Sequence, residues 1–300
     1  MKRAAPIFVI LAGILWGTMG TLVRNLNACG LNSLDIVLIR AQGSTLLLFL
    51  YLIIFNRAAF KIKLKDLWVF LGTGIASIVF FNACYFYALE QMTMATACVL
   101  LYTAPAFVII LSAILFHEKV TKKKFICLIM VFAGCVFVTG MIGGENKLTL
   151  IGFLAGLGSG LGYALYSIFG RYAIEKGYSS ITITFYTFLI AGLSTMIFAN
   201  PFTCWTRAFS TTTTGISAVM MALACTIAPF MLYTIGLQYI ENGVASMMAT
   251  IEPVTSAICG IIFFHEKITL EILIGMILVF SGIIICNISF GGKKQITAGK

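Results

Sequence analysis

Charged residues are scarce in this chain, and their scarcity decides its class. They make up 10% of the 300 residues, whereas about 25% is usual in soluble domains. Hydrophobic residues make up 60%, and the mean hydropathy is +1.04. Uncharged runs reach the ~20 residues that a helix needs to cross a bilayer, and they lack the alternating polarity of barrel strands. The composition excludes a soluble domain and predicts an all-α polytopic membrane protein.

Motifs that bind nucleotides or metals are missing as well. The chain has no Gly-x-x-x-x-Gly-Lys-[Ser/Thr] loop and no His-Glu-x-x-His helix. The longest predicted connections, 56–66 and 200–213, are too short to hold a soluble catalytic domain. An intramembrane enzyme would need paired acids or metal ligands, and the predicted spans offer no such set. We therefore predict no enzyme activity, no cofactor and no metal site, so that any transport draws on a gradient or on a separate partner.

Paired cysteine motifs are also absent. The nine cysteines are scattered, and none forms a Cys-x-x-Cys pair. Most fall in predicted spans, where we expect them to act as small apolar packing residues. Cys29 and Cys204 fall in predicted outer loops, so a disulfide between them stays open as an alternative.

The apolar runs divide into ten predicted transmembrane helices. Their ranges are 6–24, 35–55, 67–88, 93–116, 124–141, 150–171, 181–199, 214–237, 243–264 and 271–289. The first run follows Met1-Lys2-Arg3 and resembles a secretory signal, but it is long for a signal core and lacks a small-x-small cleavage site. We expect it to be retained as a helix.

The net charge of +10 is divided unequally between the two membrane sides. If the amino terminus is cytoplasmic, four basic residues lie outside: Arg24, Lys147, Arg207 and Lys267. Fifteen lie on the cytoplasmic side: Lys2, Arg3, Arg57, Lys61, Lys63, Lys65, Lys119, Lys122, Lys123, Lys124, Arg171, Lys176, Lys293, Lys294 and Lys300. The positive-inside rule then places both termini in the cytoplasm and the protein in the cytoplasmic (inner) membrane. In this interpretation the basic residues fix topology and do not bind nucleic acid; contact of the 57–65 loop and the tail with anionic lipid is the alternative.

One pattern occurs twice in the chain. Pro105 and Pro253 are 148 residues apart, and at the same offset Phe116-His117-Glu118-Lys119 recurs as Phe264-His265-Glu266-Lys267. At an offset of 147, Gly13, Trp16 and Arg24 match Gly160, Tyr163 and Arg171. Each half, 1–145 and 146–300, therefore holds five helices. Because five is odd, the halves enter the membrane from opposite sides as inverted repeats, which is typical of alternating-access carriers.

Two further interpretations depend on this repeat. The first interpretation is that the duplication produced a carrier with two exchangeable halves. The alternative is that it only enlarged the helix bundle. The two His-Glu pairs lie at helix ends on opposite membrane faces, so they cannot share one metal ion. We expect them to cap helices or to fix the topology instead.

The order of these motifs resembles the ten-helix EamA-type members of the drug/metabolite transporter superfamily over nearly the whole chain. The matching elements are Leu15-Trp16-Gly17, Tyr85-Phe86-Tyr87-Ala88-Leu89, Ala104-Pro105-Ala106-Phe107, the two Phe-His-Glu-Lys elements and Ile251-Glu252-Pro253-Val254. The resemblance implies a proton-linked or facilitated carrier of small metabolites such as amino acids, with a central site lined by helices of both halves. It does not imply a particular solute.

Two charged residues fall inside predicted spans. Glu252 is the only carboxylate deep in a span, and its repeat partner is Ala104. A charge there costs about 2.5–3.5 kcal/mol, so we expect Glu252 to face protein or water and to be the candidate for proton or cation coupling. Bracing of the backbone beside Pro253 is the alternative. Arg40 can bind a solute carboxylate, pair with Asp35 or Glu252, or extend to the outer interface.

Aromatic and amide residues complete the candidate solute site around Arg40 and Glu252. They are Trp16, Asn82, Tyr85, Tyr102, Tyr163, Tyr166, Tyr186 and Tyr233. A phenol in hydrocarbon needs a hydrogen-bond partner, so we expect these hydroxyls to face the interior; helix packing or interfacial anchoring is the alternative for each residue.

Prolines and glycines mark places where helices bend or approach closely. Pro105, Pro229 and Pro253 interrupt the fourth, eighth and ninth predicted helices and are candidate hinges, or static kinks that shape a cavity. Gly13-x3-Gly17 and Gly152-x3-Gly156-x3-Gly160 allow the first and sixth helices to pack closely.

The sequence thus predicts a secondary active or facilitated transporter of small organic metabolites, in the first place an amino-acid or metabolite exporter that works by alternating access. Its expected partners are a small-molecule solute, the lipid bilayer and, as candidate coupling ion, the proton. No nucleic acid is expected, and a monomer and a homodimer are both open. One alternative is an importer of a quaternary amine held in an aromatic cage. Another is a channel, which would favour a symmetric oligomer and a polar stripe along one helix.

Overall fold

Helices account for all regular structure in the described part of the chain. The computed structural model describes residues 4–141, 149–265 and 267–290, and these residues contain no strand. The helices of the first half are α1 (Ala5–Gly17), α2 (Met19–Asn27), α3 (Ser33–Phe55), α4 (Leu67–Leu71), α5 (Phe80–Gln91), α6 (Met94–Leu101), α7 (Ala104–Leu115) and α8 (Lys122–Val138). Those of the second half are α9 (Leu150–Glu175), α10 (Ser180–Thr195), α11 (Pro201–Ala208), α12 (Thr212–Ala222), α13 (Ala228–Leu237), α14 (Asn242–Ala249), α15 (Ile251–Phe264) and α16 (Leu270–Phe290). The predicted boundary at residue 145, and Lys147 and Glu266, lie outside the described residues.

Long apolar helices make this chain a multi-pass membrane protein. Within the described residues, eight helical stretches are long and apolar enough to cross a bilayer. They are Ala5–Asn27, Ser33–Phe55, Leu64–Gln91, Met94–Leu115, Leu150–Glu175, Thr212–Leu237, Asn242–Phe264 and Leu270–Asn287. Each coincides with one predicted span. The other two predicted spans, 124–141 and 181–199, coincide with the shorter helices α8 and α10, which have 17 and 16 residues.

Three of the predicted helices are broken where the sequence led us to expect continuous ones. The first breaks at Thr18, the fourth after Leu101 and the ninth at Thr250. At each break a threonine hydroxyl donates to a carbonyl three residues back: Thr18 to Leu15 at 2.8 Å, Thr103 to Leu100 at 2.6 Å and Thr250 to Met247 at 2.5 Å. These bonds satisfy carbonyls that a helix end leaves without a partner.

Pro105 and Pro253 lie in the first turn after a helix break, whereas Pro229 follows a π-helical segment inside the continuous stretch Thr212–Leu237. Pro105 is at the second residue of α7, Pro229 at the second residue of α13 and Pro253 at the third residue of α15. In the first turn of a helix the backbone N–H groups make no intrahelical hydrogen bond, so a proline, which has no N–H, costs none there. The fixed φ of proline also suits a helix. The fourth and ninth predicted helices are thus interrupted just before Pro105 and Pro253, and the role of these prolines as hinges or static kinks stays a prediction.

Each half also contains a π-helical segment, which no sequence pattern predicted. The first, η4, spans Gly72–Val79, and the second, η5, spans Leu223–Ile227 and leads into Pro229. Positions 75–79 of the first segment match 223–227 of the second at the 148-residue offset. A π turn holds an extra residue and often marks a functional position in a helix.

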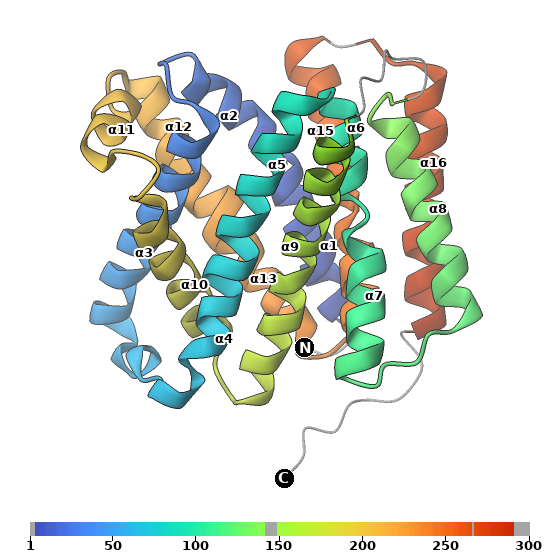
Figure 1. Cartoon of the computed structure of the whole chain (residues 1–300), viewed down its shortest axis with the longest axis horizontal. Coiled ribbons are helices and arrows are strands. Elements are labelled where there is room, and N and C mark those ends of the chain that lie inside the picture. Colours follow the sequence, from blue (N-terminus) through green and yellow to red (C-terminus); the bar gives the residue numbers. More distant parts are fainter. Residues whose placement is uncertain (1–3, 142–148, 266, 291–300) are drawn as a thin grey trace.

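The two halves are interleaved, as Figure 1 shows. Helix α1 of the first half packs on α13 and α15 of the second, and α9 of the second half packs on α5, α6 and α7 of the first. At one edge α3 and α10 pair, and at the other edge α8 and α16 pair. The first helix of each half, α1 or α9, thus packs against helices of the other half.

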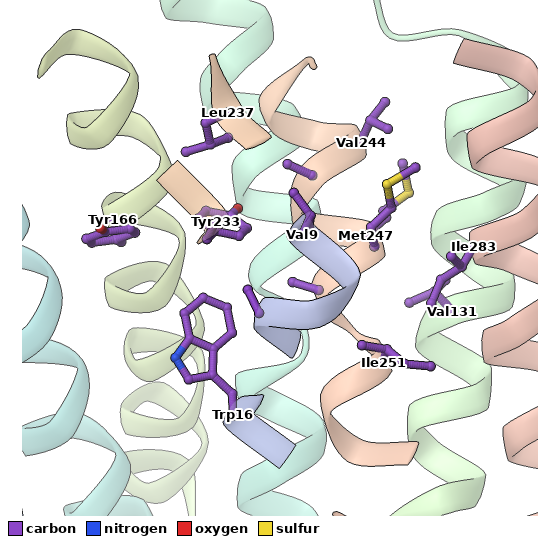
Figure 2. Packing of buried hydrophobic residues seen from close by; sticks show 14 of the residues in the cluster. Val9, Trp16, Val131, Tyr166, Tyr233, Leu237, Val244, Met247, Ile251 and Ile283 are labelled. Atoms are coloured by element: carbon purple, nitrogen blue, oxygen red, sulfur yellow. The ribbon is translucent and has the colours of Figure 1, made fainter. Parts of the chain in front are cut away.

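Glycines bring α8 and α16 into backbone contact. A Cβ added at Gly134 would lie 2.9 Å from the Gly275 carbonyl oxygen, and one added at Gly275 would lie 2.7 Å from the Gly134 carbonyl oxygen. Further along this pair, Val131 and Ile283 face each other across the two helices (Figure 2), and both are buried. Small residues at such crossings let membrane helices associate through close packing.

We expect Gly275→Val to destabilise the protein by about 1–3 kcal/mol, because the added methyl groups have no room against the Gly134 backbone. Thermal unfolding of the purified protein in detergent measures the change. The matched control is Gly20→Val in α2, where an added Cβ meets no atom within 4 Å. Equal unfolding temperatures for the two variants would contradict the close contact.

Helix α11 at the outer corner was missed, since the sequence predicts a loop there. Asn200 accepts a hydrogen bond from the Thr203 N–H at 3.3 Å, which caps the helix, and Pro201 starts it. The helix buries Cys204, whose thiol donates to the Asp35 carboxylate at 3.2 Å. Burial first, and then the Asp35 carboxylate, raise the pKa of Cys204 to about 12. Cys29 and Cys204 are both free thiols, so the disulfide alternative is wrong.

Candidate functional site

Glu252 lies where the ninth helix restarts after its break. It is the second residue of α15, and its carboxylate accepts a hydrogen bond from the Tyr163 hydroxyl of α9 at 3.1 Å. A carboxylate in the first turn of a helix is stabilised by the helix dipole. Tyr163 and the start of α15 thus hold the carboxylate in one position inside the bundle.

Arg40 is the second charge in the interior. It is the eighth of the 23 residues of α3, is 6% exposed, and donates to the Met19 sulfur at 3.5 Å. Its Nε has no hydrogen-bond partner among the described residues. Arg40 and Glu252 interact electrostatically. The interior thus holds a cation and an anion that act on each other from helices of opposite halves.

Among the described residues, no ion pair joins Arg40 to Asp35. Asp35 uses its carboxylate to accept from the Asn32 N–H at 3.0 Å in the capping box of α3, and from Cys204. Because Arg40 is buried, it does not extend to the outer interface, and that interpretation is wrong.

A small cavity lies where the breaks of the fourth and ninth predicted helices meet. Its lining consists of Leu101, Tyr102, Ala104, Pro105, Tyr163, Ser246, Ala249 and Thr250. These residues come from both sides of the α6–α7 break and from the end of α14, together with one tyrosine of α9. The cavity measures about 10 Å³, the room that about one water molecule needs. A solute of several atoms therefore fits only after these helices separate.

Glycines place the long helices against the same two breaks. A Cβ added at Gly13 of α1 would lie 2.7 Å from the Ala249 carbonyl oxygen, and one at Gly17 would lie 2.6 Å from the Glu252 carbonyl oxygen. A Cβ added at Gly160 of α9 would lie 2.9 Å from the Leu100 carbonyl oxygen. The predicted glycine packing is therefore present, and in each case its partner is the broken helix of the opposite half.

An aromatic cluster packs beside the cavity. Trp16 contacts Phe230 at a ring-centroid distance of 5.1 Å, Tyr233 at 5.5 Å and Tyr163 at 6.2 Å, and Figure 2 shows its indole near Tyr233. The Tyr166 hydroxyl bonds to Thr234 at 3.0 Å, and the Tyr233 hydroxyl bonds to Ser167 at 2.7 Å. These rings and hydroxyls contact one another, so in this conformation they brace α9 against α13.

The remaining candidates are spread more widely. Tyr102 lines the cavity, and the Tyr85 hydroxyl bonds to the Cys98 sulfur at 3.0 Å, joining α5 to α6. Asn82 donates to the Ile78 carbonyl of its own helix at 2.7 Å, just after the π segment. Tyr186 donates to the Phe60 carbonyl at 2.8 Å and packs on Phe70 and Phe185, so it anchors the 57–60 turn away from Glu252.

Two polar groups near the site were missed by sequence analysis. Ser246 lines the cavity, is 2% exposed, and its hydroxyl has no hydrogen-bond partner among the described residues. Thr250 forms the break of the ninth helix. A serine or threonine in an apolar span is common, so neither leaves a signal in the sequence. Among the described residues no group of three or more His, Cys, Asp or Glu side chains is placed to hold a metal ion.

The His-Glu elements have matched backbone geometry. His117 and His265 both have φ of 55°, the left-handed conformation, and His265 ends α15. Such a residue commonly terminates a helix, so the expectation of capping is confirmed at both histidines.

Comparison with known proteins gives the same architecture and one family. The model of the EamA-like transporter family matches residues 3–140 and again 150–288. An uncharacterized transporter of Archaeoglobus fulgidus is 29% identical over 284 residues, which cover 94% of this chain and 96% of that protein. The uncharacterized transporter YvbV of Bacillus subtilis is 26% identical over 80% of this chain and 78% of its own length.

Two further similarities are narrower in what they show. The pseudopaline exporter CntI of Pseudomonas aeruginosa is 25% identical over 138 residues, or 46% of this chain and 47% of that protein. A solved structure, described only as the crystal structure of a protein, superposes with a TM-score of 0.80 over 97% of this chain and 98% of its own, at 15% identity. At that identity the likeness shows the fold alone.

Proposed function

This chain belongs to the EamA-like transporter family, and we propose that it is a secondary transporter that moves a small organic solute by alternating access of two inverted five-helix halves. The protein is a transporter of the membrane, with several apolar helices that cross it. The observation that carries the proposal is that the breaks of the fourth and ninth predicted helices meet at one cavity, beside the Glu252 carboxylate. Broken helices of this kind expose backbone ends to a solute near the bilayer midplane.

The ten-crossing topology with both termini in the cytoplasm belongs to the same proposal. Figure 1 shows the loops that follow α3, α7 and α9 on one side of the bundle. Ten of the 14 lysines and arginines in the described residues lie on these loops or on the adjoining ends of α8 and α9: Arg57, Lys61, Lys63, Lys65, Lys119, Lys122, Lys123, Lys124, Arg171 and Lys176. Helix α8 and helix α10 are then the fifth and seventh crossings, although they are short. The positive-inside rule makes this lysine-rich face the cytoplasmic one.

The interior charges favour a solute that carries both signs. Arg40 offers a guanidinium with an unpaired Nε, and Glu252 offers a carboxylate that can bind an ammonium group or a proton. A free amino acid or a related metabolite has this chemistry. The name of the matched exporter CntI supports outward movement of the solute.

Flux into proteoliposomes tests the proposal. The probes are radiolabelled zwitterionic amino acids and tetramethylammonium, each measured with and without a pH gradient. We expect saturable flux of one or more amino acids that rises with the gradient. Saturable flux of tetramethylammonium alone would favour the aromatic cage, and ion conductance without saturation would favour a channel.

A further inference from the structure

Four charged side chains meet inside the lysine-rich end of the bundle. Lys124 of α8 lies 3.5 Å from Glu118 and 2.6 Å from Glu241, and Arg171 of α9 lies 4.0 Å from Glu118. The Lys124, Glu118 and Arg171 side chains are 2%, 6% and 5% exposed, and that of Glu241 is 38% exposed. Two acids and two bases therefore form a compact, neutral and largely buried charge cluster.

Among the described residues, two of the three ion pairs in this cluster, Lys124–Glu241 and Arg171–Glu118, join the first half to the second. Glu118 and Lys124 belong to residues 1–145, whereas Arg171 and Glu241 belong to residues 146–300. Arg171 also donates to the carbonyls of Leu237 at 2.5 Å and Ile240 at 2.9 Å. The cluster thus connects α9 with the carboxyl-terminal ends of α7 and α13. It also connects α9 with the starts of α8 and α14.

One of these contacts leads directly to the cavity. The Asn242 N–H, at the start of α14, donates to Glu118 at 2.8 Å, and the Asn242 amide donates to Ser112 at 3.2 Å. The other end of this eight-residue helix, Ala249, lines the cavity. A helix of eight residues is about 12 Å long, so a movement of α14 at the cavity displaces its contact with Glu118.

Two members of this cluster have no charged counterpart in the repeat. The repeat partners of Lys124 and Glu241 are Ile272 and Thr93, which carry no charge. The partner of Arg171 is Arg24, whose guanidinium lies 3.7 Å from the centroid of the Phe264 ring. The partner of Glu118 is Glu266, which lies outside the described residues. The two ends of the bundle therefore differ in charge at the positions of Lys124 and Glu241.

We propose that Glu118, Lys124, Arg171 and Glu241 form a charged latch that closes the lysine-rich face and sets which face of the transporter is open without solute. The proposal rests on the alternating-access function proposed above. Buried ions are stable only with their partners or with water, so the latch holds while its four members touch and releases when water enters among them. Such an element has two arrangements and no stable intermediate one, which is what a gate needs.

Hydrogen exchange measured by mass spectrometry on the full chain in lipid nanodiscs tests the latch without any transport assay. The variant is Lys124→Gln, which leaves Glu118 and Glu241 without their shared cation. We expect amides of 112–124 and 237–249 to exchange at least about tenfold faster, an opening change that corresponds to about 1.4 kcal/mol. Exchange in 25–35 and 200–215, on the opposite face, should be unchanged or slower.

A matched control and a second variant make the outcome decisive. Lys122→Gln removes the same charge from the same helix turn at an exposed position, and it should exchange like the unmodified protein. Glu241→Gln, at the most exposed member, gives the same test if Lys124→Gln does not fold.

Other results would overturn the latch. Unchanged exchange at 112–124 and 237–249 would show that the cluster does not hold this face closed. Faster exchange on both faces would show general loosening of the bundle. Selective opening of one face in a protein that moves no solute would leave the latch in place and overturn the proposed transport function.

Discussion

Glu252→Gln is expected to abolish the coupling of solute movement to a pH gradient while leaving a folded protein. Glutamine has nearly the same shape and can keep the hydrogen bond with Tyr163, but it cannot release or take up a proton. If one proton moves per solute, a gradient of one pH unit is worth about 1.4 kcal/mol and supports about a tenfold solute ratio across the membrane. In the variant this ratio should fall to one, measured as solute accumulation in proteoliposomes.

Two comparisons separate proton coupling from bracing at this position. Glu252→Asp keeps a carboxyl group and should keep a measurable gradient response. Tyr163→Phe removes the hydrogen bond and keeps the carboxylate, so it should change the rate of flux more than the ratio at equilibrium. Coupling that survives in Glu252→Gln, with a lowered unfolding temperature, would instead assign Glu252 to bracing of the α15 start beside Pro253.

Arg40→Gln is expected to raise the KM for a carboxylate-bearing solute by about tenfold to a hundredfold. Hydrogen bonds to a charged group are worth about 1.5–3 kcal/mol, and the unpaired Nε of Arg40 is available to make one. The measurement is initial flux against concentration for the amino acid that the solute panel identifies. The same amino acid with its carboxylate converted to an amide should show nearly equal KM values in both proteins.

The control for this prediction changes the residue that contacts Arg40 and leaves the charge of Arg40 in place. Met19→Leu deletes the sulfur that accepts from Arg40 and conserves the volume, so its KM should stay close to that of the unmodified protein. If Arg40→Gln raises KM equally for the acid and the amide, Arg40 does not bind the carboxylate. Its role would then be limited to electrostatic interaction with Glu252.

Much of the fold followed from run length and repetition, because both are explicit in the sequence. Apolar runs longer than a bilayer is thick can form only spanning helices, and eight of the predicted spans coincide with such helices in the described residues. The breaks at Thr18 and Thr250 were not predictable in the same way. A threonine that bonds back to its own helix has the same local sequence context as one in an unbroken helix.

The site was predictable only where it carries charge. Glu252 is conspicuous because a carboxylate in an apolar run has few neutral explanations, whereas Ser246 lines the same cavity and leaves no pattern. Lys124 shows the opposite difficulty. It was assigned to topology with its neighbours in the 119–124 loop, since sequence does not tell a lysine that faces water from one that is 1% exposed.

The matched π segments bear on the history of the chain. A wide turn at 75–79 and another at 223–227 occupy the same place in two copies whose local sequences have diverged. One insertion before the duplication explains both turns. If the insertions were independent, they would have had to occur at the same position in both copies. On the simpler account the wide turn is older than the fused chain, and it was already present in an ancestor of half this length.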